Sequence, residues 1–316
     1  MKDFSGKYAA ITGGGTGMGR ELAIQLVAQG CNVAMCDVSA ANMAVTRRLC
    51  AEQGTQGTRV STFVADVSVE EQMQAWAKAL QRELETDRIH LLFNNAGIGG
   101  GGSIVNGDRA QWDKTFAVCW GGVLNGVRTF LPLMMKADEA HIVNTSSVNG
   151  FWASIGPGRP HTAYCAAKFA VKGFSEALIT DLAMTAPHVK VSVVMPGHIG
   201  TEIVHNSRKI LTGSETEIDV PAARKMIAAW GIDTSSLTDE QVRQAIIAQA
   251  EAFRDNAPTS AAEAAKIILD GVKADKWRIL VGPDAEFLDA KVRANPEGAY
   301  TPEFYNELLN QTGWRL

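Results

Sequence analysis

The sequence is poor in the features that mark secreted, membrane and disulfide-rich proteins. Its 316 residues include five cysteines, an odd number without C-x-x-C spacing. This predicts buried or free thiols in a reducing compartment rather than a disulfide framework. The first seven residues lack the apolar core of a secretory signal, and no apolar run is long enough to span a bilayer. We therefore expect a cytoplasmic protein without a membrane partner.

An excess of charge of one sign is also missing. The chain has 30 Lys and Arg residues against 34 Asp and Glu, a net charge of −4, so nothing favours nucleic acid as a partner. No group of His, Cys, Asp and Glu has the spacing of metal ligands, so the sequence predicts no metal site. What is present, 46% hydrophobic and 20% charged residues, is the composition of an ordinary globular protein.

Short β-branched runs alternate with longer helical patterns through the first two hundred residues. The predicted strands are Tyr8–Thr12, Asn32–Asp37, Arg59–Val64, Ile89–Asn94, His141–Ser146, Lys190–Met195 and, near the end of the chain, Trp277–Val281. The predicted helices between them are Gly19–Gln29, Ala40–Gln53, Val69–Leu84, Arg109–Met135 and Ala163–Ala183. Strands separated by helices require right-handed crossovers, so the pattern predicts an α/β fold with a doubly wound, parallel, seven-stranded sheet. Ligands are expected beyond the carboxyl ends of its strands.

Residues 202–258 interrupt this alternation. Two amphipathic helices are predicted there, at Val220–Ala229 and Thr238–Arg254. The segment leaves the sheet after the sixth strand and returns before the seventh. We therefore interpret it as a helical lid over the ligand crevice, inserted in a single domain of residues 1–316.

A glycine-rich segment, Thr12–Gly19, follows the first predicted strand and opens the first predicted helix. Glycines allow a tight turn and let backbone N–H groups approach a pyrophosphate at the positive end of the helix. A generic turn is the alternative, but the position within a strand–helix–strand unit favours a dinucleotide site. Asp37 closes the second strand 18 residues beyond Gly19, where a carboxylate accepts hydrogen bonds from an adenosine ribose. Capping of the next helix is the alternative role for Asp37.

Tyr164 and Lys168 are four residues apart, so they lie on one face of a helix, one turn from each other. A free phenol titrates near pH ~10 and is a poor acid–base catalyst at neutral pH until a nearby positive charge stabilises the phenolate. The lysine can supply that charge. The spacing alone also arises by chance, so the neighbouring motifs decide its meaning.

Seven short motifs stand in one order along the chain. They are T-G-x-x-x-G-x-G at Thr12–Gly19, Asp37, Asp66-Val67, Asn94-Asn95-Ala96-Gly97, the run from Ile142 to Ser147, Tyr164-x-x-x-Lys168, and Pro196-Gly197-x-x-x-Thr201. Together they resemble the short-chain dehydrogenase/reductase family, in its compact single-domain branch, over about residues 5–201. The resemblance implies a Rossmann fold and an NAD- or NADP-dependent oxidoreductase that interconverts a secondary alcohol and its ketone by hydride transfer.

The resemblance also implies roles for individual residues. Tyr164 would be the general acid for ketone reduction and the base for alcohol oxidation, Ser147 would polarise the substrate carbonyl, and Lys168 would bind the nicotinamide ribose and lower the pKa of the phenol. The implied cofactor-binding residues are Gly13, Gly15, Thr16, Gly17, Met18, Gly19, Asp37, Asp66, Val67, Asn94, Ala96, Gly97, Tyr164, Lys168, Pro196, Gly197, Ile199 and Thr201. The Asp37 carboxylate would repel a 2′-phosphate, so we expect NAD. An NADP-preferring reductase is the alternative, if Arg20 takes the phosphate.

One residue departs from the family pattern. The family usually has a catalytic asparagine in the helix after the fourth strand, thirteen residues before a proline; here Cys119 stands thirteen residues before Pro132. Asn125 would fit only if the helix register shifted by six residues. A thiol is a weak hydrogen-bonding group, so either protons reach solvent by another path or the enzyme is slow. A small buried side chain is the favoured interpretation of Cys119, with a redox-sensing thiol, in a non-catalytic dinucleotide-binding protein, as the alternative.

The second departure is the long loop Phe151–His161 between Ser147 and Tyr164. We expect its aromatic residues to line the substrate pocket, with surface packing as the alternative. The candidate substrate residues are Asn149, Phe151, Trp152, His198 and Ile203, although His198 is given no chemical role. The lid is also rich in apolar residues: Ile203, Ile210, Leu211, Met226, Ile227 and Trp230. We therefore expect a bulky, hydrophobic alcohol or ketone as substrate. The family resemblance further implies a homotetramer or homodimer built on the helices Arg109–Met135 and Ala163–Ala183.

Overall fold

The computed structural model of the protein describes residues 1–214, 218–229, 233–312 and 314. Its centre is a seven-stranded sheet in the order β3-β2-β1-β4-β5-β6-β9, and every neighbouring pair is parallel. The strands are β1 (Tyr8–Thr12), β2 (Asn32–Asp37), β3 (Val60–Val64), β4 (Leu91–Asn94), β5 (Ala140–Thr145), β6 (Val189–Pro196) and β9 (Arg278–Val281). All seven predicted strands are confirmed. The strand order reverses between β1 and β4, which places a ligand crevice beyond the ends of these two strands.

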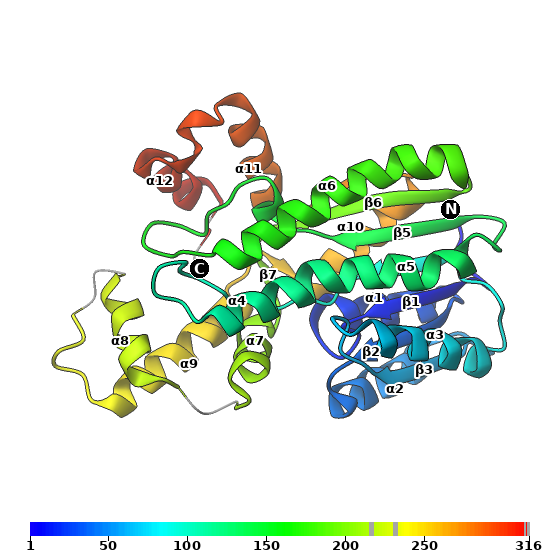
Figure 1. Ribbon diagram of the computed structural model, residues 1–316, viewed down its shortest axis with the longest axis horizontal. Helices are drawn as coiled ribbons and strands as arrows, with labels where there is room; N and C mark the ends of the chain where they lie inside the picture. Colours follow the sequence, from blue (N-terminus) through cyan, green and yellow to red (C-terminus); the bar gives the residue numbers. More distant parts are fainter. Residues whose placement is uncertain (215–217, 230–232, 313, 315–316) are drawn as a thin grey trace.

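Helices cover both faces of the sheet (Figure 1). The helices on one face are α1 (Gly17–Ala28), α2 (Ala40–Gln53) and α10 (Ala261–Lys273), and those on the other are α3 (Glu70–Leu84), α5 (Gly122–Met134) and α6 (Thr162–Thr185). Each layer closes its own apolar core against the sheet. A parallel sheet buried on both faces explains why the strands read as apolar runs rather than as alternating patterns.

The helix predicted over Arg109–Met135 is interrupted. It divides into α4 (Arg109–Phe116), a turn of π-helix at Ala117–Gly121 and α5. The apolar pattern runs unbroken through the turn, so periodicity gives no sign of it. A π-turn widens the helix locally and is frequent at functional sites.

The segment after β6 contains the two predicted lid helices, α8 (Val220–Ala229) and α9 (Asp239–Asp255). They pack on each other through a small separate core. The sequence did not predict α7 (Ile203–Thr212) or the two-residue strands β7 (Ile199–Gly200) and β8 (Thr259–Ser260), which pair with each other. Trp230 and the side chain of Met226, both named as apolar lid residues, lie outside the part of the chain that the structure describes.

The sequence also did not predict the helices after β9. We call residues 283–312 and Trp314 the C-terminal arm; it contains α11 (Pro283–Ala294), a 3₁₀ turn (Glu297–Tyr300) and α12 (Pro302–Thr312). Figure 1 shows the arm and the lid helices at the same end of the sheet, to which the strands run. Apolar side chains of the arm bury Val148 and Trp152, which follow β5. The arm therefore reaches the loop between Ser147 and Tyr164.

The described residues can also be compared with the expectations about membrane-spanning helices, cysteines and metal sites. None of their helices combines the length and apolarity needed to cross a bilayer. All five cysteines are free and buried. No three His, Cys, Asp or Glu side chains in this part of the chain are grouped so that they could hold a metal ion.

Candidate active site

The glycine-rich loop between β1 and α1 is folded so tightly that side chains do not fit. Gly13 and Gly17 have φ angles of +67° and +54°, a conformation that favours glycine. A methyl group on Gly13 would lie 2.9 Å from the Cα of Ala96, and one on Gly19 would lie 2.1 Å from the carbonyl oxygen of Gly13. No side chain caps the start of α1, so its first N–H groups remain available to an anion. The loop fits the pyrophosphate of a dinucleotide.

The end of β4 is tied to this loop by Asn95, a residue for which the motif alone predicts no separate role. Its side-chain amide donates to the carbonyl oxygen of Thr12 over 3.1 Å, and the Thr12 hydroxyl accepts from the backbone N–H groups of Asn95 and Ala96. The neighbouring Asn94 instead donates from Nδ2 to Oδ1 of Asn144 over 2.8 Å, and so joins β4 to β5. Two adjacent asparagines thus tie the end of β4 to β1 on one side and to β5 on the other.

Asp37 stands at the end of β2, as predicted, and faces the glycine loop. Its carboxylate accepts hydrogen bonds of 3.0 Å from the backbone N–H groups of Gly15 and Ser39. Arg20, the alternative phosphate ligand, is held by other groups: it donates to the carbonyl oxygen of Gly15 over 2.5 Å and to the hydroxyl of Thr46 over 3.1 Å. The position offers a carboxylate, rather than a free cation, to the adenosine ribose.

Asp66 and Val67 lie beyond β3, on the same side of the crevice. Burial raises the pKa of Asp66, but hydrogen bonds from Lys114 and Ser68 outweigh burial and lower it below its usual range. The ion pair with Lys114 of α4 is 2.5 Å long. Val67 packs against Gly122, where a methyl group would lie 2.6 Å from the valine side chain. No local pattern indicates Lys114, because the pair joins residues 48 positions apart.

Ser147, Tyr164 and Lys168 come together at the carboxyl end of β5. The Lys168 ammonium lies 5.3 Å from the centre of the Tyr164 ring and donates to the carbonyl oxygen of Thr145 over 2.9 Å. Burial raises the pKa of Tyr164 above its usual range, and a hydrogen bond with the Ser147 side chain opposes this rise. Burial also lowers the pKa of Lys168. The Ser146 hydroxyl, which donates to the backbone carbonyl of Lys168 over 2.7 Å, holds α6 against the strand.

Cys119 lies in the middle of the π-turn and is fully buried. Its thiol donates to the carbonyl oxygen of Ile98 over 3.1 Å and accepts from the N–H of the same residue over 3.4 Å. A methyl group on Gly97 would lie 3.5 Å from Lys168 Nζ and 3.7 Å from Cys119 Sγ. The thiol therefore stands beside the lysine and joins the π-turn to the segment after β4.

The substrate candidates in the long loop have protein partners. Asn149 donates through Nδ2 to the carbonyl oxygens of Trp152 and Ser154, and so shapes the loop. Phe151 packs under the guanidinium of Arg278. Trp152 is 1% exposed and donates from Nε1 to the carbonyl oxygen of Ala299 over 2.7 Å. Its aromatic neighbours are in the C-terminal arm. The structure does not bring Trp152 to Tyr164, because a segment nearly 150 residues away covers it.

Two further candidates lie in or just after the segment from Pro196 to Thr201. His198 is buried, its Nε2 lies 2.6 Å from the carbonyl oxygen of Phe253, and its ring packs on the Phe253 ring at 4.3 Å. It is thus engaged with α9 of the lid. Ile203, at the start of α7, is half-buried.

The unpredicted helix α7 crosses the crevice. Asn206 donates to the hydroxyl of Thr16 over 3.0 Å, and the Ser207 hydroxyl accepts from the N–H of Gly99 over 2.8 Å. Ile210 and Leu211, further along the helix, pack against the core. Thr201 lies against Gly17, where a methyl group would approach it to 3.1 Å. Helix α7 therefore touches both the glycine loop and the segment after β4.

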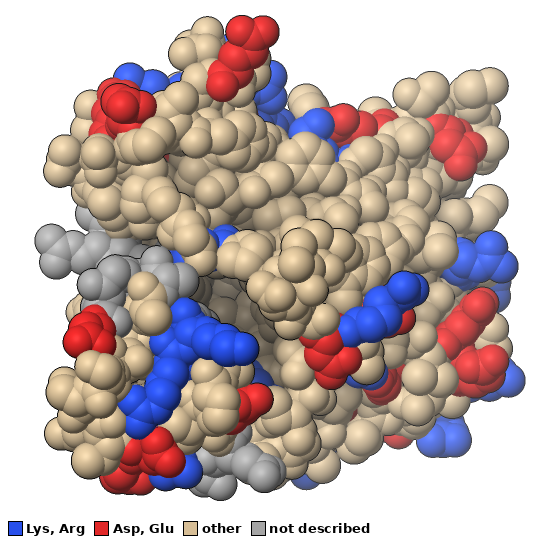
Figure 2. Space-filling view, turned by 60° about the vertical axis from the view of Figure 1, so that its left-hand side comes forward, with Lys and Arg blue, Asp and Glu red and all other residues tan. Residues whose placement is uncertain are grey.

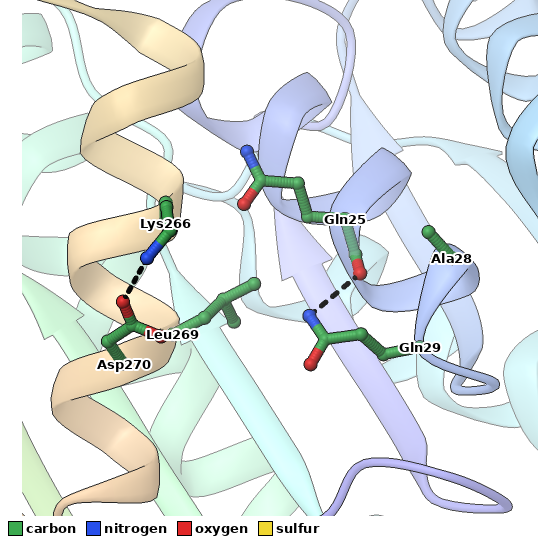
Figure 3. Close-up of a pocket in the computed structure, with 6 residues that line it drawn as sticks. All are labelled: Gln25, Ala28, Gln29, Lys266, Leu269 and Asp270. Atoms are coloured by element: carbon green, nitrogen blue, oxygen red, sulfur yellow. Dashed lines mark hydrogen bonds and ion pairs between the residues drawn. The ribbon is translucent and has the colours of Figure 1, made fainter.

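Pockets open on the surface of the described residues, and two of them are near named helices. One, of about 480 Å³, is lined by residues around the start of α6, among them Arg159, His161, Cys165 and Phe169. The other, of about 340 Å³, lies between α1 and α10 (Figure 3) and is lined near the far end of α1, at Gln25 and Gln29. That end points away from the crevice, so we give the second pocket no role. Figure 2, in which the lid end of the molecule comes forward, also shows a hollow with mostly uncharged walls and Lys or Arg atoms on part of its rim.

Known proteins are similar to this chain in sequence and in fold. The family model for "short chain dehydrogenase" matches residues 7–211. A "putative oxidoreductase SadH" of Mycobacterium tuberculosis is 34% identical over 293 residues, which are 93% of this chain and 92% of the relative. Levodione reductase of Leifsonia aquatica is 32% identical over 66% of this chain and 75% of its own. The crystal structure of a Burkholderia phymatum short-chain dehydrogenase/reductase in complex with NAD matches with a TM-score of 0.75 and 31% identity, covering 94% of this chain and 95% of that one.

Proposed function

Because the chain belongs to the short-chain dehydrogenase/reductase family of oxidoreductases, we propose that it interconverts a bulky, hydrophobic secondary alcohol and its ketone with NAD(H). The observation that carries this proposal is the group of Ser147, Tyr164 and Lys168, in which the serine and the lysine are buried and the tyrosine is partly buried. It lies at the carboxyl end of the sheet, on the same edge as a glycine loop shaped for a dinucleotide. Hydride transfer needs such a proton donor beside a cofactor site.

The cofactor proposal rests on the crevice between β1 and β4. The glycine loop and the uncapped start of α1 would hold the pyrophosphate. The Asp37 carboxylate would accept hydrogen bonds from the ribose hydroxyls in place of the one that it now accepts from the N–H of Gly15. A 2′-phosphate would meet that carboxylate while Arg20 is engaged elsewhere, which supports NAD over NADP. The B. phymatum relative is a complex with NAD. When bound, the nicotinamide supplies the hydride or accepts it.

The proton chemistry is proposed for three side chains. The phenol of Tyr164, whose pKa is raised, keeps its proton at neutral pH, as an acid in ketone reduction must. Ser147, hydrogen-bonded to that phenol, would also donate to the substrate oxygen. Lys168 would favour the phenolate that remains after the proton has left. Its ammonium is already held at the phenol by the Thr145 carbonyl.

The substrate is proposed from the apolar surroundings of this group. Ile203, Ile210 and Leu211 of α7 are partly buried near the crevice, and residues 202–258 would act as a lid within one domain. Bulky apolar ketones bury more surface in such a site than small polar ones do. A homo-oligomer through α5 and α6 is part of the proposal, because Phe169 and Ile179 of α6 are 43% and 37% exposed. Light scattering of the purified protein tests the oligomer.

The deciding experiment is a cofactor-oxidation screen across ketones of increasing size, run with NADH and with NADPH. We expect NADH oxidation with large ketones and its loss in Tyr164→Phe, which keeps the ring and removes the proton. Fluorescence titration with NADH checks that the variant still binds cofactor. No turnover with any ketone, together with intact NADH binding, would favour a dinucleotide-binding protein without catalysis. A clear preference for NADPH would overturn the choice of cofactor.

A further inference from the structure

One side chain beside the proposed proton donor has no part in the proposed proton chemistry. His161 immediately precedes α6, one helical turn before Tyr164. The two ring centres are 4.7 Å apart and the planes are tilted by 33°. The imidazole therefore covers one side of the phenol in which the proton chemistry takes place.

The other side of the imidazole faces the segment after β4. A methyl group on Gly99 would lie 3.9 Å from His161 Cε1 and 3.8 Å from the Ser207 hydroxyl of α7. His161 also lines the pocket of about 480 Å³ at the start of α6. The ring is thus enclosed by the catalytic helix, the loop after β4 and helix α7, and it borders open space.

The backbone around His161 is fixed, so the ring keeps this place. Thr162 donates from its N–H and its hydroxyl to the carbonyl oxygen of Gly102 over 3.1 and 2.8 Å, and Ala163 donates to that of Gly101 over 3.0 Å. Trp112 of α4 donates to the same Thr162 hydroxyl over 3.1 Å. The residue next to His161 therefore anchors the loop to two other elements.

The two ring nitrogens are available. Within the residues that the structure describes, neither nitrogen has a hydrogen-bond partner; the same holds for His188 and His205, whereas the rings of His90, His141 and His198 each have at least one. Burial lowers the pKa of the His161 imidazole to about 4, so the ring is neutral at pH 7. A neutral imidazole offers one donor and one acceptor, and can therefore bind either a carbonyl or a hydroxyl group.

We propose that His161 is a specificity-determining residue that hydrogen-bonds a second oxygen of the substrate, close to the carbon that exchanges hydride. This rests on the proposed function and narrows its substrate class to hydroxyketones, diketones and the corresponding diols. The reacting oxygen lies between Ser147 and Tyr164, and the second oxygen meets the imidazole beside the phenol. The imidazole takes no proton in the reaction. It binds and orients the substrate.

The test compares ketones that match in size and differ in one oxygen. The probes are 2-methyl- and 2-hydroxy-1-tetralone and the corresponding pair substituted at position 4, which are bulky ketones, each reduced with NADH by the wild-type enzyme. One hydrogen bond accounts for up to about tenfold in kcat/KM, so we expect the wild-type enzyme to favour a hydroxylated member by that factor. His161→Phe, which keeps an aromatic ring against Tyr164, should remove this preference and leave kcat/KM for the methylated member within about twofold.

Two further variants separate substrate binding from support of the loop. His161→Asn keeps a donor and an acceptor, and should retain part of the preference for the hydroxylated member. Thr162→Val loosens the anchor of the loop, and should lower kcat/KM for both members of a pair alike. NADH binding by fluorescence shows that each variant is folded and binds cofactor.

The outcomes that overturn the inference differ from those that overturn the proposed function. An active wild-type enzyme with no preference for a hydroxylated member in either pair overturns the role of His161 alone. So does an equal fall for both members in His161→Phe, because a support of Tyr164 would act on every substrate. A wild-type enzyme that reduces no ketone with either cofactor overturns the proposed function, and this inference with it.

Discussion

The two sides of the candidate active site are held together by different kinds of contact. On the cofactor side, side chains at the ends of adjacent strands bond backbone groups next to them: Asp37 of β2 accepts from the N–H of Gly15, and Asn95 after β4 donates to the carbonyl oxygen of Thr12 in β1. On the substrate side, the loop after Ser147 is held by side chains of remote segments. The indole of Trp152 and its acceptor Ala299 are 147 residues apart.

Because of this difference, we expect the two sides to tolerate amino-acid substitutions to different degrees. Contacts between adjacent parallel strands follow from the sheet itself and leave little freedom to the residues that make them. Contacts between a loop and a C-terminal arm depend on a few large side chains, which can be exchanged while the sheet stays intact. We therefore expect changes on the cofactor side to abolish binding of the cofactor, and changes on the substrate side to alter the choice of substrate.

The largest effect is expected for Gly19→Ala. The new methyl group would lie 2.1 Å from the carbonyl oxygen of Gly13. The glycine loop must therefore open, and its backbone N–H groups no longer lie where they can bind the pyrophosphate. We expect NADH affinity to fall by more than about 100-fold, since several backbone hydrogen bonds act together. Fluorescence titration measures this. Gly173→Ala in α6, where the methyl group meets open space, is the matched control and should bind NADH normally.

A smaller effect is expected for Trp152→Phe on the substrate side. The variant keeps an aromatic ring among Phe304 and Trp314 but leaves the buried carbonyl of Ala299 without its donor. Such a loss destabilises a protein by roughly 1–3 kcal/mol. We expect kcat/KM for bulky ketones to fall while the Kd for NADH stays within about twofold. A parallel loss of NADH affinity would show that the two sides are not independent.

The same division decides which features could be predicted from the sequence. The bounds of β1 and β2 coincide with those predicted, and Asp37 ends its strand as expected, because these features depend on short apolar runs and on a local glycine pattern. The burial of Trp152 could not be predicted. No residue near position 152 indicates that a 3₁₀ turn at Glu297–Tyr300 provides the acceptor for its indole.

Helix α7 and the π-turn could not be predicted from the sequence either, each for a different physical reason. Helix α7 is amphipathic but only ten residues long, which is too short for a helix to be stable by itself; its contacts with Thr16 and Gly99 hold it in place. The π-turn at Ala117–Gly121 leaves the apolar pattern unchanged. Both features depend on tertiary contacts that override local preference.

Cys119 lies between the two sides, because its thiol joins the π-turn to the segment after β4. We test its role with Cys119→Asn. An amide is larger than the fully buried thiol and must fit between Ile98 and Lys168, so we expect a loss of stability of about 1–2 kcal/mol from overpacking. If proton supply limits the rate, kcat is preserved or rises despite this loss. Urea unfolding and steady-state turnover measure the two effects. Complete loss of turnover in a folded variant would show that the thiol itself is needed.

The smallest effect is expected for Asp66→Asn, which removes the ion pair that joins the cofactor side to α4. The pKa of Asp66 is lowered in the folded protein, so its ionised form adds stability above the carboxyl pKa of the unfolded chain, near ~4, and this stability is lost as the pH falls through the lower folded value. Both partners are partly exposed, so we expect less than about 1 kcal/mol at pH 7. In urea unfolding, the difference between variant and wild type should shrink from pH 7 towards pH 3. A difference that persists unchanged at pH 3 would show that the effect of Asp66 does not come from its charge.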